Sequence, residues 1–100
     1  MSYRLIFHAK AKQEYITSFL WYGLQLKGLE DRFKFAIDTV LHKISSNPQY
    51  FGYCKEPFRE ASVKRFPFTI IFTINQLESS VFIAAIYHTK RNPSYKFRKQ

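Results

Sequence analysis

Two apolar stretches decide the fold of this 100-residue chain: RFPFTIIFTI, residues Arg65–Ile74, and SVFIAAIYH, residues Ser80–His88. Every second residue from Phe66 to Ile74 is aromatic or aliphatic, which predicts a strand with one apolar face. The second stretch is apolar on both faces, as is typical of a strand in the middle of a sheet. The polar residues 75–79 between them are few, so the two strands are expected to form a hairpin.

The first half of the chain predicts one short strand and two helices. The strand is expected over residues 3–8, and a helix follows from Ala9, with apolar residues at spacings of four, three and four along one face. Gly28 can adopt the left-handed conformation that ends a helix. A second apolar stripe begins at Leu29, and Asn47-Pro48 ends that helix because proline disfavours helix in the residue before it. The short connection predicts an antiparallel helical hairpin.

The remaining segments complete the expected fold. Residues 49–57 have the composition of an irregular loop, and Phe58–Lys64 is expected to be an edge strand. The fold class is therefore α+β, with the order β-α-α-β-β-β and the helical hairpin packed on a small antiparallel sheet. If successive elements alternate in direction, the first strand pairs antiparallel with the last, and the spatial order is 1-4-3-2. No linker or repeat divides the sequence, so residues 1–100 are expected to form a single domain.

Composition limits the possible functions. The formal net charge is +9, which favours a polyanionic or acidic partner. Cys54 is the single cysteine, so no intramolecular disulfide is expected, and with only three scattered histidines the sequence predicts no metal site and no cofactor. Basic residues interrupt the N-terminal apolar residues, and no apolar stretch approaches the roughly 20 residues of a membrane span. We therefore expect a cytoplasmic protein with no membrane partner and no small-molecule substrate.

Basic residues are the main candidates for a functional site. The central strand is expected to deliver His88, Lys90 and Arg91 to one end of the sheet, close to the tail with Tyr95 and Arg98. Arg59 and Arg65 have the same parity on the predicted edge strand and are expected to share a face. His88 also has a purely structural interpretation, since it ends a strand in which Phe82, Ala84 and Ile86, on the same predicted face, are expected to be buried. By contrast, Glu14 is expected to be solvated, Trp21-Tyr22 to be core residues, and Cys54 to have no catalytic role.

Several of these motifs, in order, resemble the RelE/ParE superfamily of bacterial toxins from type II toxin–antitoxin systems. They are Arg65-Phe66-Pro67-Phe68, the strand ending in His88 with Arg91 and Pro93 beyond it, Trp21-Tyr22, Asn47-Pro48, and Arg59 at the start of a strand. The resemblance covers nearly the whole chain and implies the same strand order. It departs from the ParE-like pattern in the tail, where Tyr95 and Phe97 stand near the position often held by a tryptophan.

The resemblance implies a toxin neutralised by a cognate antitoxin, and two alternatives for its action. The ParE-like members, among them plasmid stabilisation proteins, act on DNA gyrase, and the Arg-Phe-Pro-Phe motif favours this side. Target binding would then involve Arg59, Arg65, Lys90, Arg91 and Arg98. The RelE-type members cleave mRNA on the ribosome; the catalytic residues would then be His88 or Tyr95 as acid or base, with Arg59, Arg65 and Arg91 stabilising charge. A third possibility is an inactive module that only binds a regulator.

Overall fold

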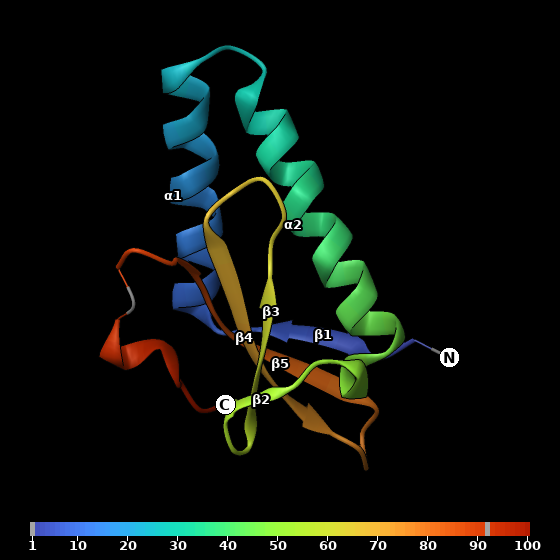
Figure 1. The fold of residues 1–100 in the computed structure, drawn as a ribbon. Helices are drawn as coiled ribbons and strands as arrows, with labels where there is room; N and C mark the ends of the chain where they lie inside the picture. The colour runs from blue at the N-terminus through green and yellow to red at the C-terminus, as the bar shows by residue number, and fades with distance from the viewer. Residues whose placement is uncertain (1, 92) are drawn as a thin grey trace.

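The computed structural model describes residues 2–91 and 93–100, so Met1 and Asn92 lie outside the description. In this part of the chain, two helices pack on one side of a five-stranded sheet, and two short 3-10 helices follow α2 and the last strand (Figure 1). The elements are β1 (Arg4–Phe7), α1 (Ala9–Gln25), α2 (Leu29–Ser46), η1 (Pro48–Tyr50), β2 (Tyr53–Lys55), β3 (Phe58–Ser62), β4 (Phe68–Asn75), β5 (Ser80–His88) and η2 (Ser94–Lys96). The expected α+β class and helical hairpin are confirmed.

The sheet has the order β1-β5-β4-β3-β2. The four predicted strands keep their expected relative order, and β2 is added at the edge beyond β3. The prediction of a wholly antiparallel sheet is wrong, because β1 pairs parallel with β5, with Arg4 opposite Ser80 and Phe7 opposite Ile83. The other pairings, β2 with β3, β3 with β4 and β4 with β5, are antiparallel.

The unpredicted strand β2 explains the parallel pairing. It lies in the segment expected to be an irregular loop, and it adds one reversal of direction between α2 and β3. With this extra reversal, β5 runs in the same direction as β1. β2 has only three residues, all exposed, so no alternation of apolar and polar residues could reveal it. β3 is consequently not an edge strand, and it ends at Ser62 instead of Lys64.

The larger hydrophobic core lies between the helical hairpin and the sheet. The predicted apolar face of residues 66–74 lies toward this core. Phe68, Ile70 and Phe72 are buried in the core, and Phe66 and Ile74 pack at its margin. The turn at Gly28 has the expected left-handed conformation, with a φ of 93°, and it allows both helices to reach this core.

β5 contains a bulge that changes which side chains share a face. Ile71 is opposite Ala85 and Phe72 is opposite Ile83, so Ala84 is an extra residue without a partner on β4. As a result, Ile83 and Ile86 both face the helices, while Phe82, Ala84 and Ala85 face the other side of the sheet. The expectation that Phe82 and Ala84 share a face with Ile86 is therefore wrong, because one extra residue reverses the alternation.

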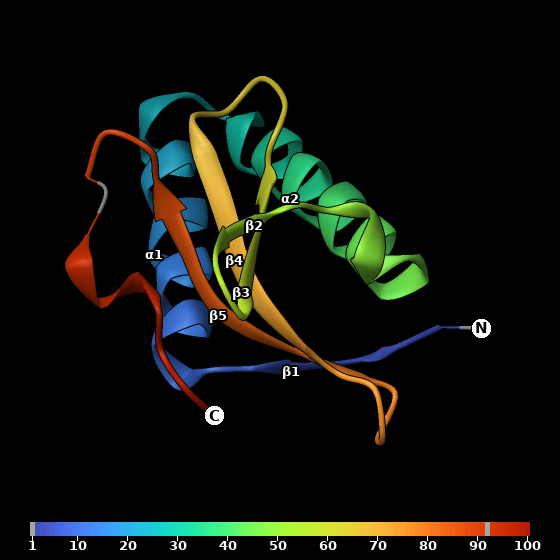
Figure 2. The same cartoon turned by 60° about the horizontal axis from the view of Figure 1, so that its bottom comes forward.

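The second face of the sheet has a smaller core, which the C-terminal tail covers in part. Phe97 packs against Phe58, with ring centroids 5.2 Å apart, next to buried side chains of β4 and β5. Figure 2 shows the tail passing beside the end of β5 and returning toward the start of α1. Among residues 2–91 and 93–100, no helix is both long and apolar enough to cross a membrane.

A polar contact links the two helices beside the core. The Tyr15 hydroxyl donates to Asp38 Oδ1 at 2.8 Å, and Lys34 pairs with the other oxygen of that carboxylate at 2.6 Å. Burial, followed by the hydrogen bond to Asp38, raises the pKa of Tyr15 above its ordinary value of 10.0. The folded state therefore favours the neutral phenol.

Replacing Tyr15 with phenylalanine is expected to lower the free energy of unfolding by about 1 kcal/mol at neutral pH, because the hydrogen bond is lost. The raised pKa means that this contribution is complete below pH ~10 and is lost as the pH rises above that value. Urea unfolding of both proteins from neutral to alkaline pH would measure the difference. If the difference in stability between the two proteins stays constant above pH ~10, the stabilisation does not come from the neutral Tyr15 phenol.

Candidate functional site

A groove of about 600 Å³ lies between α1, the outer edge of β5 and the C-terminal tail. It exists because β1 pairs with β5 only as far as Ile83, so the last residues of β5 have no neighbouring strand on that side. The groove, called the His88 groove below, is lined by Gln13, Glu14, Thr17, Ser18, Trp21, Tyr22, Phe68, Ile86, Tyr87, His88, Lys90, Arg91, Pro93 and Tyr95. Four of the predicted site residues, His88, Lys90, Arg91 and Tyr95, are thus brought together.

His88 is half-buried at the end of β5 and holds the turn that follows. Its Nδ1 accepts a hydrogen bond from the Lys90 amide at 3.1 Å, and its carbonyl accepts from the Arg91 amide at 2.9 Å. The ring meets Phe68 edge-on, with centroids 5.3 Å apart. Since Nδ1 is an acceptor, the neutral ring carries its proton on Nε2. His88 therefore has a structural role, and its second nitrogen remains available for a ligand.

The cations and the phenol around His88 are largely accessible. Lys90 and Arg91 are exposed and form no ion pair with any described residue, and Tyr95 is 61% exposed. A guanidinium and an ammonium next to each other suit a carboxylate or a phosphate. An imidazole and a phenol in the same groove are groups that can also transfer protons.

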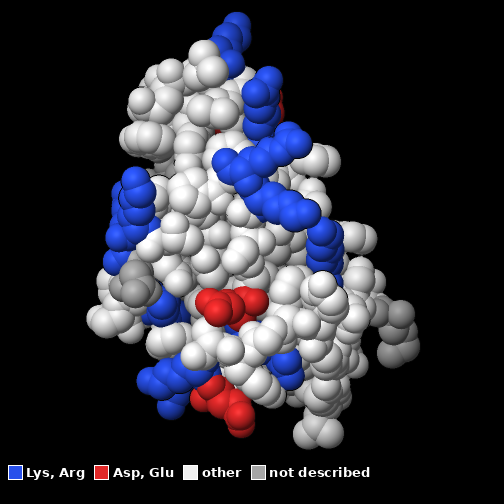
Figure 3. All heavy atoms as spheres, in the orientation of Figure 1, with Lys and Arg blue, Asp and Glu red and all other residues white. Residues whose placement is uncertain are grey.

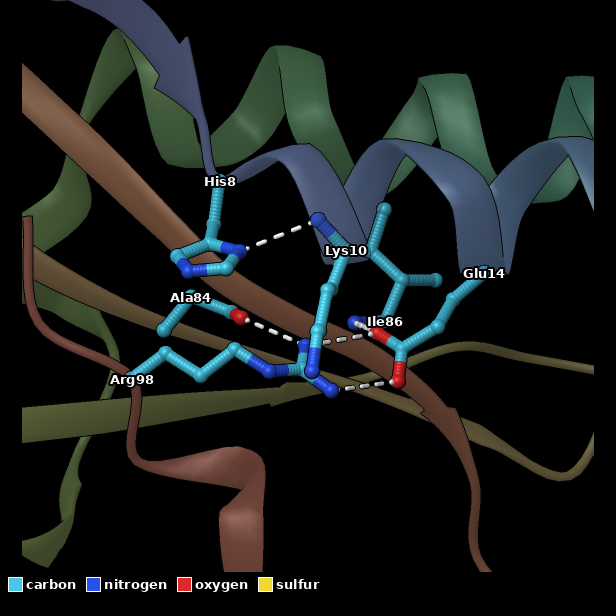
Figure 4. A network of polar contacts seen from close by, with 6 residues as sticks. All are labelled: His8, Lys10, Glu14, Ala84, Ile86 and Arg98. Carbon is cyan, nitrogen blue, oxygen red and sulfur yellow. Dashed lines mark hydrogen bonds and ion pairs between the residues drawn. The ribbon is translucent and has the colours of Figure 1, made fainter.

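Arg98 lies behind this groove and is almost fully engaged inside the protein (Figure 4). Its guanidinium makes two contacts with Glu14, at 3.1 and 3.0 Å, and donates to the Ala84 carbonyl at 3.0 Å. Glu14 Oε1 also accepts from the Ile86 amide at 3.0 Å. The pair thereby satisfies two backbone groups of β5 beyond the end of β1 and attaches the tail to α1.

This pairing corrects the expectation that Glu14 is a solvated surface residue. The Arg98 side chain is 9% exposed and that of Glu14 is 23% exposed. Glu14 and Arg98 are 84 positions apart, so no spacing in the sequence could indicate the contact. The sequence gives only a general indication of an ion pair: Glu14 is one of few carboxylates in a strongly basic chain, so many basic residues could pair with it.

Arg59 and Arg65 do not join the His88 groove. Arg59 Nη1 donates to the Phe51 carbonyl at 2.6 Å, and Nη2 donates to the Tyr53 hydroxyl at 3.0 Å. Its guanidinium also lies 4.1 Å from the centroid of the Tyr53 ring, so it holds the segment between η1 and β2. Arg65 lies in the loop after β3 and is exposed. Because β3 ends at Ser62, the parity argument that placed both arginines on one face does not extend to Arg65.

Trp21 is a lining residue that sequence reasoning assigned to the core. Tyr22 is buried, at 9% exposure, whereas Trp21 is 53% exposed and lines the groove. Adjacent residues on a helix are separated by about 100°, so only one of the two can face the sheet directly. This signal was present in the sequence and could have separated the pair.

The surroundings of Cys54 disfavour a nucleophilic role for its thiol. Burial, followed by the nearby Glu60 carboxylate, raises the pKa of the Cys54 thiol, which disfavours the reactive thiolate. Among the described residues, no group of three or more histidine, cysteine, aspartate or glutamate side chains could hold a metal ion.

Comparison with known proteins identifies the fold. No family model matches the chain, and no curated protein matches its sequence. Among solved structures, a mutant of the E. coli toxin RelE in the free state superposes with a TM-score of 0.63, covering 92% of this chain and 88% of that chain at 12% sequence identity. The chain therefore has the fold of RelE.

Proposed function

We propose that this chain is the toxin of a type II toxin–antitoxin pair in the RelE/ParE superfamily. It would inhibit bacterial growth in the cytoplasm by binding an essential target such as DNA gyrase, and a cognate antitoxin would neutralise it. The observation that carries this proposal is the RelE fold over 92% of the chain. The net charge of +9 is consistent with it, since an acidic antitoxin would mask a basic surface.

Two features of the His88 groove favour recognition over catalysis. Arg59, which would assist a nuclease by stabilising charge, uses its donors on the protein itself, and Arg65, predicted for the same role, does not line the groove. Lys90 and Arg91 remain exposed and can bind anionic groups of a target. We therefore infer that Arg91, with Lys90, recognises the target, and that His88 mainly shapes the turn that presents them.

The groove also supports a second candidate, a ribosome-dependent mRNA endoribonuclease. His88, Tyr95 and two cations line the same hollow. In such a reaction, a base removes the proton of the ribose 2′-hydroxyl, the oxygen attacks phosphorus, and an acid protonates the 5′-oxygen that leaves. Lys90 and Arg91 would stabilise the charge on the phosphorane.

Induced expression of the chain alone is expected to arrest bacterial growth. Under the recognition mechanism, Arg91→Ala abolishes the arrest, His88→Gln stays largely toxic, and transcripts remain intact, because an uncharged side chain cannot replace a guanidinium on an anion. Growth curves with RNA analysis and a supercoiling assay measure these outcomes. Arg4→Ala is a matched control, since Arg4 is exposed on β1 and does not line the groove.

Other results would exclude the preferred mechanism. The nuclease mechanism is correct if the wild type cuts transcripts on ribosomes and a folded His88→Gln protein loses ~10²–10⁴ of the cleavage rate. Circular dichroism checks folding first, because His88 also holds a turn. Normal growth with confirmed soluble expression of the wild type would contradict both mechanisms and favour an inactive binding module.

A further inference from the structure

A second and larger groove lies on the other side of the helical hairpin, away from His88. It has a volume of about 1390 Å³ and is bounded by α2, η1 and the loop that joins β3 to β4. None of its lining residues belongs to the His88 groove. We call it the α2 groove.

The α2 groove has the length of a peptide-binding site. Its lining residues extend from Leu29, the first residue of α2, to Asn47, just after the last. A helix of 18 residues is about 27 Å long, because each residue adds 1.5 Å. A groove of this length can accept about eight residues of an extended peptide or a helix as long as α2.

The groove has large apolar side chains that the protein leaves exposed. Phe35 on α2 is 75% exposed, and Tyr50 on η1 is 79% exposed. Val40, a buried residue of the main core, and Phe66, which packs at the margin of that core, also line the hollow. Exposed aromatic residues beside a continuous apolar surface are typical anchors of protein interfaces.

The charges around the groove are predominantly positive. Arg32, Lys43, Lys64 and Arg65 line it, with Asp31 as the single carboxylate. Among the described residues, the ion pairs are Lys34–Asp38 and Glu14–Arg98, so none of these four cations is neutralised. Figure 3 shows lysine and arginine side chains in a band on this face of the molecule, over the region of α2 and the β3–β4 loop.

Arg65 is held at the groove by an unusual backbone conformation. Its φ is 73°, in the left-handed region that residues with a side chain rarely adopt. The loop around it is fixed by hydrogen bonds from the Val63 amide to the Phe68 carbonyl, at 3.0 Å, and from the Phe68 amide to the Phe66 carbonyl, at 2.8 Å. Backbone strain of this kind concentrates at sites that bind ligands or partners.

We propose that the α2 groove binds an acidic, amphipathic peptide segment of a partner protein. Apolar side chains of the segment pack against Phe35 and Tyr50, and its carboxylates pair with Arg65 and the neighbouring cations. A nucleic acid would use the positive charge but would leave most of the apolar surface unused. The proposal does not depend on the toxin function; in a toxin–antitoxin pair, the segment would belong to the antitoxin.

The test begins with a displayed library of random peptides of about 16 residues, selected on the immobilised full-length protein. The expected result is enrichment of acidic sequences with apolar residues at regular spacing. Enriched peptides are then synthesised, and their binding is measured by fluorescence anisotropy. Enrichment of neutral or basic sequences, or no enrichment at all, would contradict the proposal.

Variants then locate the binding site. Phe35→Ala and Arg65→Glu are each expected to weaken the enriched peptide about tenfold or more, as is usual for anchor residues. Leu24→Ala and Arg4→Glu are matched controls, since Leu24 is 84% exposed on α1 and Arg4 is exposed on β1. Equal losses in the controls would place the peptide elsewhere.

A last measurement separates a peptide from a nucleic acid. Single-stranded RNA and DNA are titrated as competitors of the labelled peptide at physiological salt. Weak competition supports the proposal, whereas tight RNA or DNA binding that is lost in Arg65→Glu but kept in Phe35→Ala overturns it. Peptide binding is measured without cells, so it can be observed even if the protein is not toxic. Growth arrest, in turn, can be observed even if no peptide binds the α2 groove.

Discussion

Phe72→Ala is expected to lower the free energy of unfolding by roughly 3–5 kcal/mol, because it removes a fully buried aromatic side chain from the main core. Phe72 lies in β4, between Arg59 of β3 and Ile83 of β5, and its ring meets that of Phe51, with centroids 5.7 Å apart. Few neighbours can collapse into the resulting cavity, since those on both sides belong to the sheet.

Urea denaturation measures this loss, provided that the free energy of unfolding depends equally steeply on urea concentration in the wild type and the variant. Phe35→Ala provides a control with the same chemical change. Phe35 is 75% exposed, so its replacement should cost less than ~1 kcal/mol. A Phe72→Ala loss of well under 1 kcal/mol would mean that the assignment of the sheet face is wrong.

Removing one partner of the Glu14–Arg98 pair is the second change with a large expected effect. Glu14→Gln leaves a guanidinium that is 9% exposed without a counter-charge, and such losses typically cost 3–5 kcal/mol. Glu14 retains 23% exposure, so solvent screens part of the interaction, and we expect the free energy of unfolding to fall by about 3 kcal/mol. Urea denaturation measures the loss, and Glu78→Gln, at an exposed turn position, is the control.

A double-mutant cycle tests whether the pair acts as a unit. Arg98→Met removes the charge but keeps a long side chain, and the double variant should be more stable than the sum of the two single losses predicts. Hydrogen exchange of the Ile86 amide, which donates to Glu14, should accelerate in Glu14→Gln. Additive losses with unchanged exchange would show that Glu14 and Arg98 do not act as a unit.

The sequence by itself determined the elements whose residues repeat at a regular spacing. The apolar alternation from Phe66 to Ile74 predicted the strand of the main core, and the polar residues 75–79 predicted the hairpin. The helical stripes and Gly28 predicted the helical hairpin and its turn. These signals are local, since each arises from a face that the segment must bury.

Only the tertiary structure decided the features that depend on pairing between distant segments. The three-residue strand β2 forms because β3 offers it an edge, and its presence makes β1 parallel to β5. The bulge at Ala84 follows from the register with β4, and the sequence of β5 contains no alternation of apolar and polar residues that predicts this register. One extra residue there reverses the faces of the strand before His88.

The site was predictable only in part for the same reason. His88, Lys90, Arg91 and Tyr95 lie close together in the sequence and meet in one groove. Arg98 was predicted to bind a target but instead pairs with Glu14, because the β5 edge left unpaired beyond β1 requires an acceptor and a donor from elsewhere in the chain. Such a requirement arises only when the sheet has formed, so the sequence specifies the residues while the tertiary contacts specify their roles.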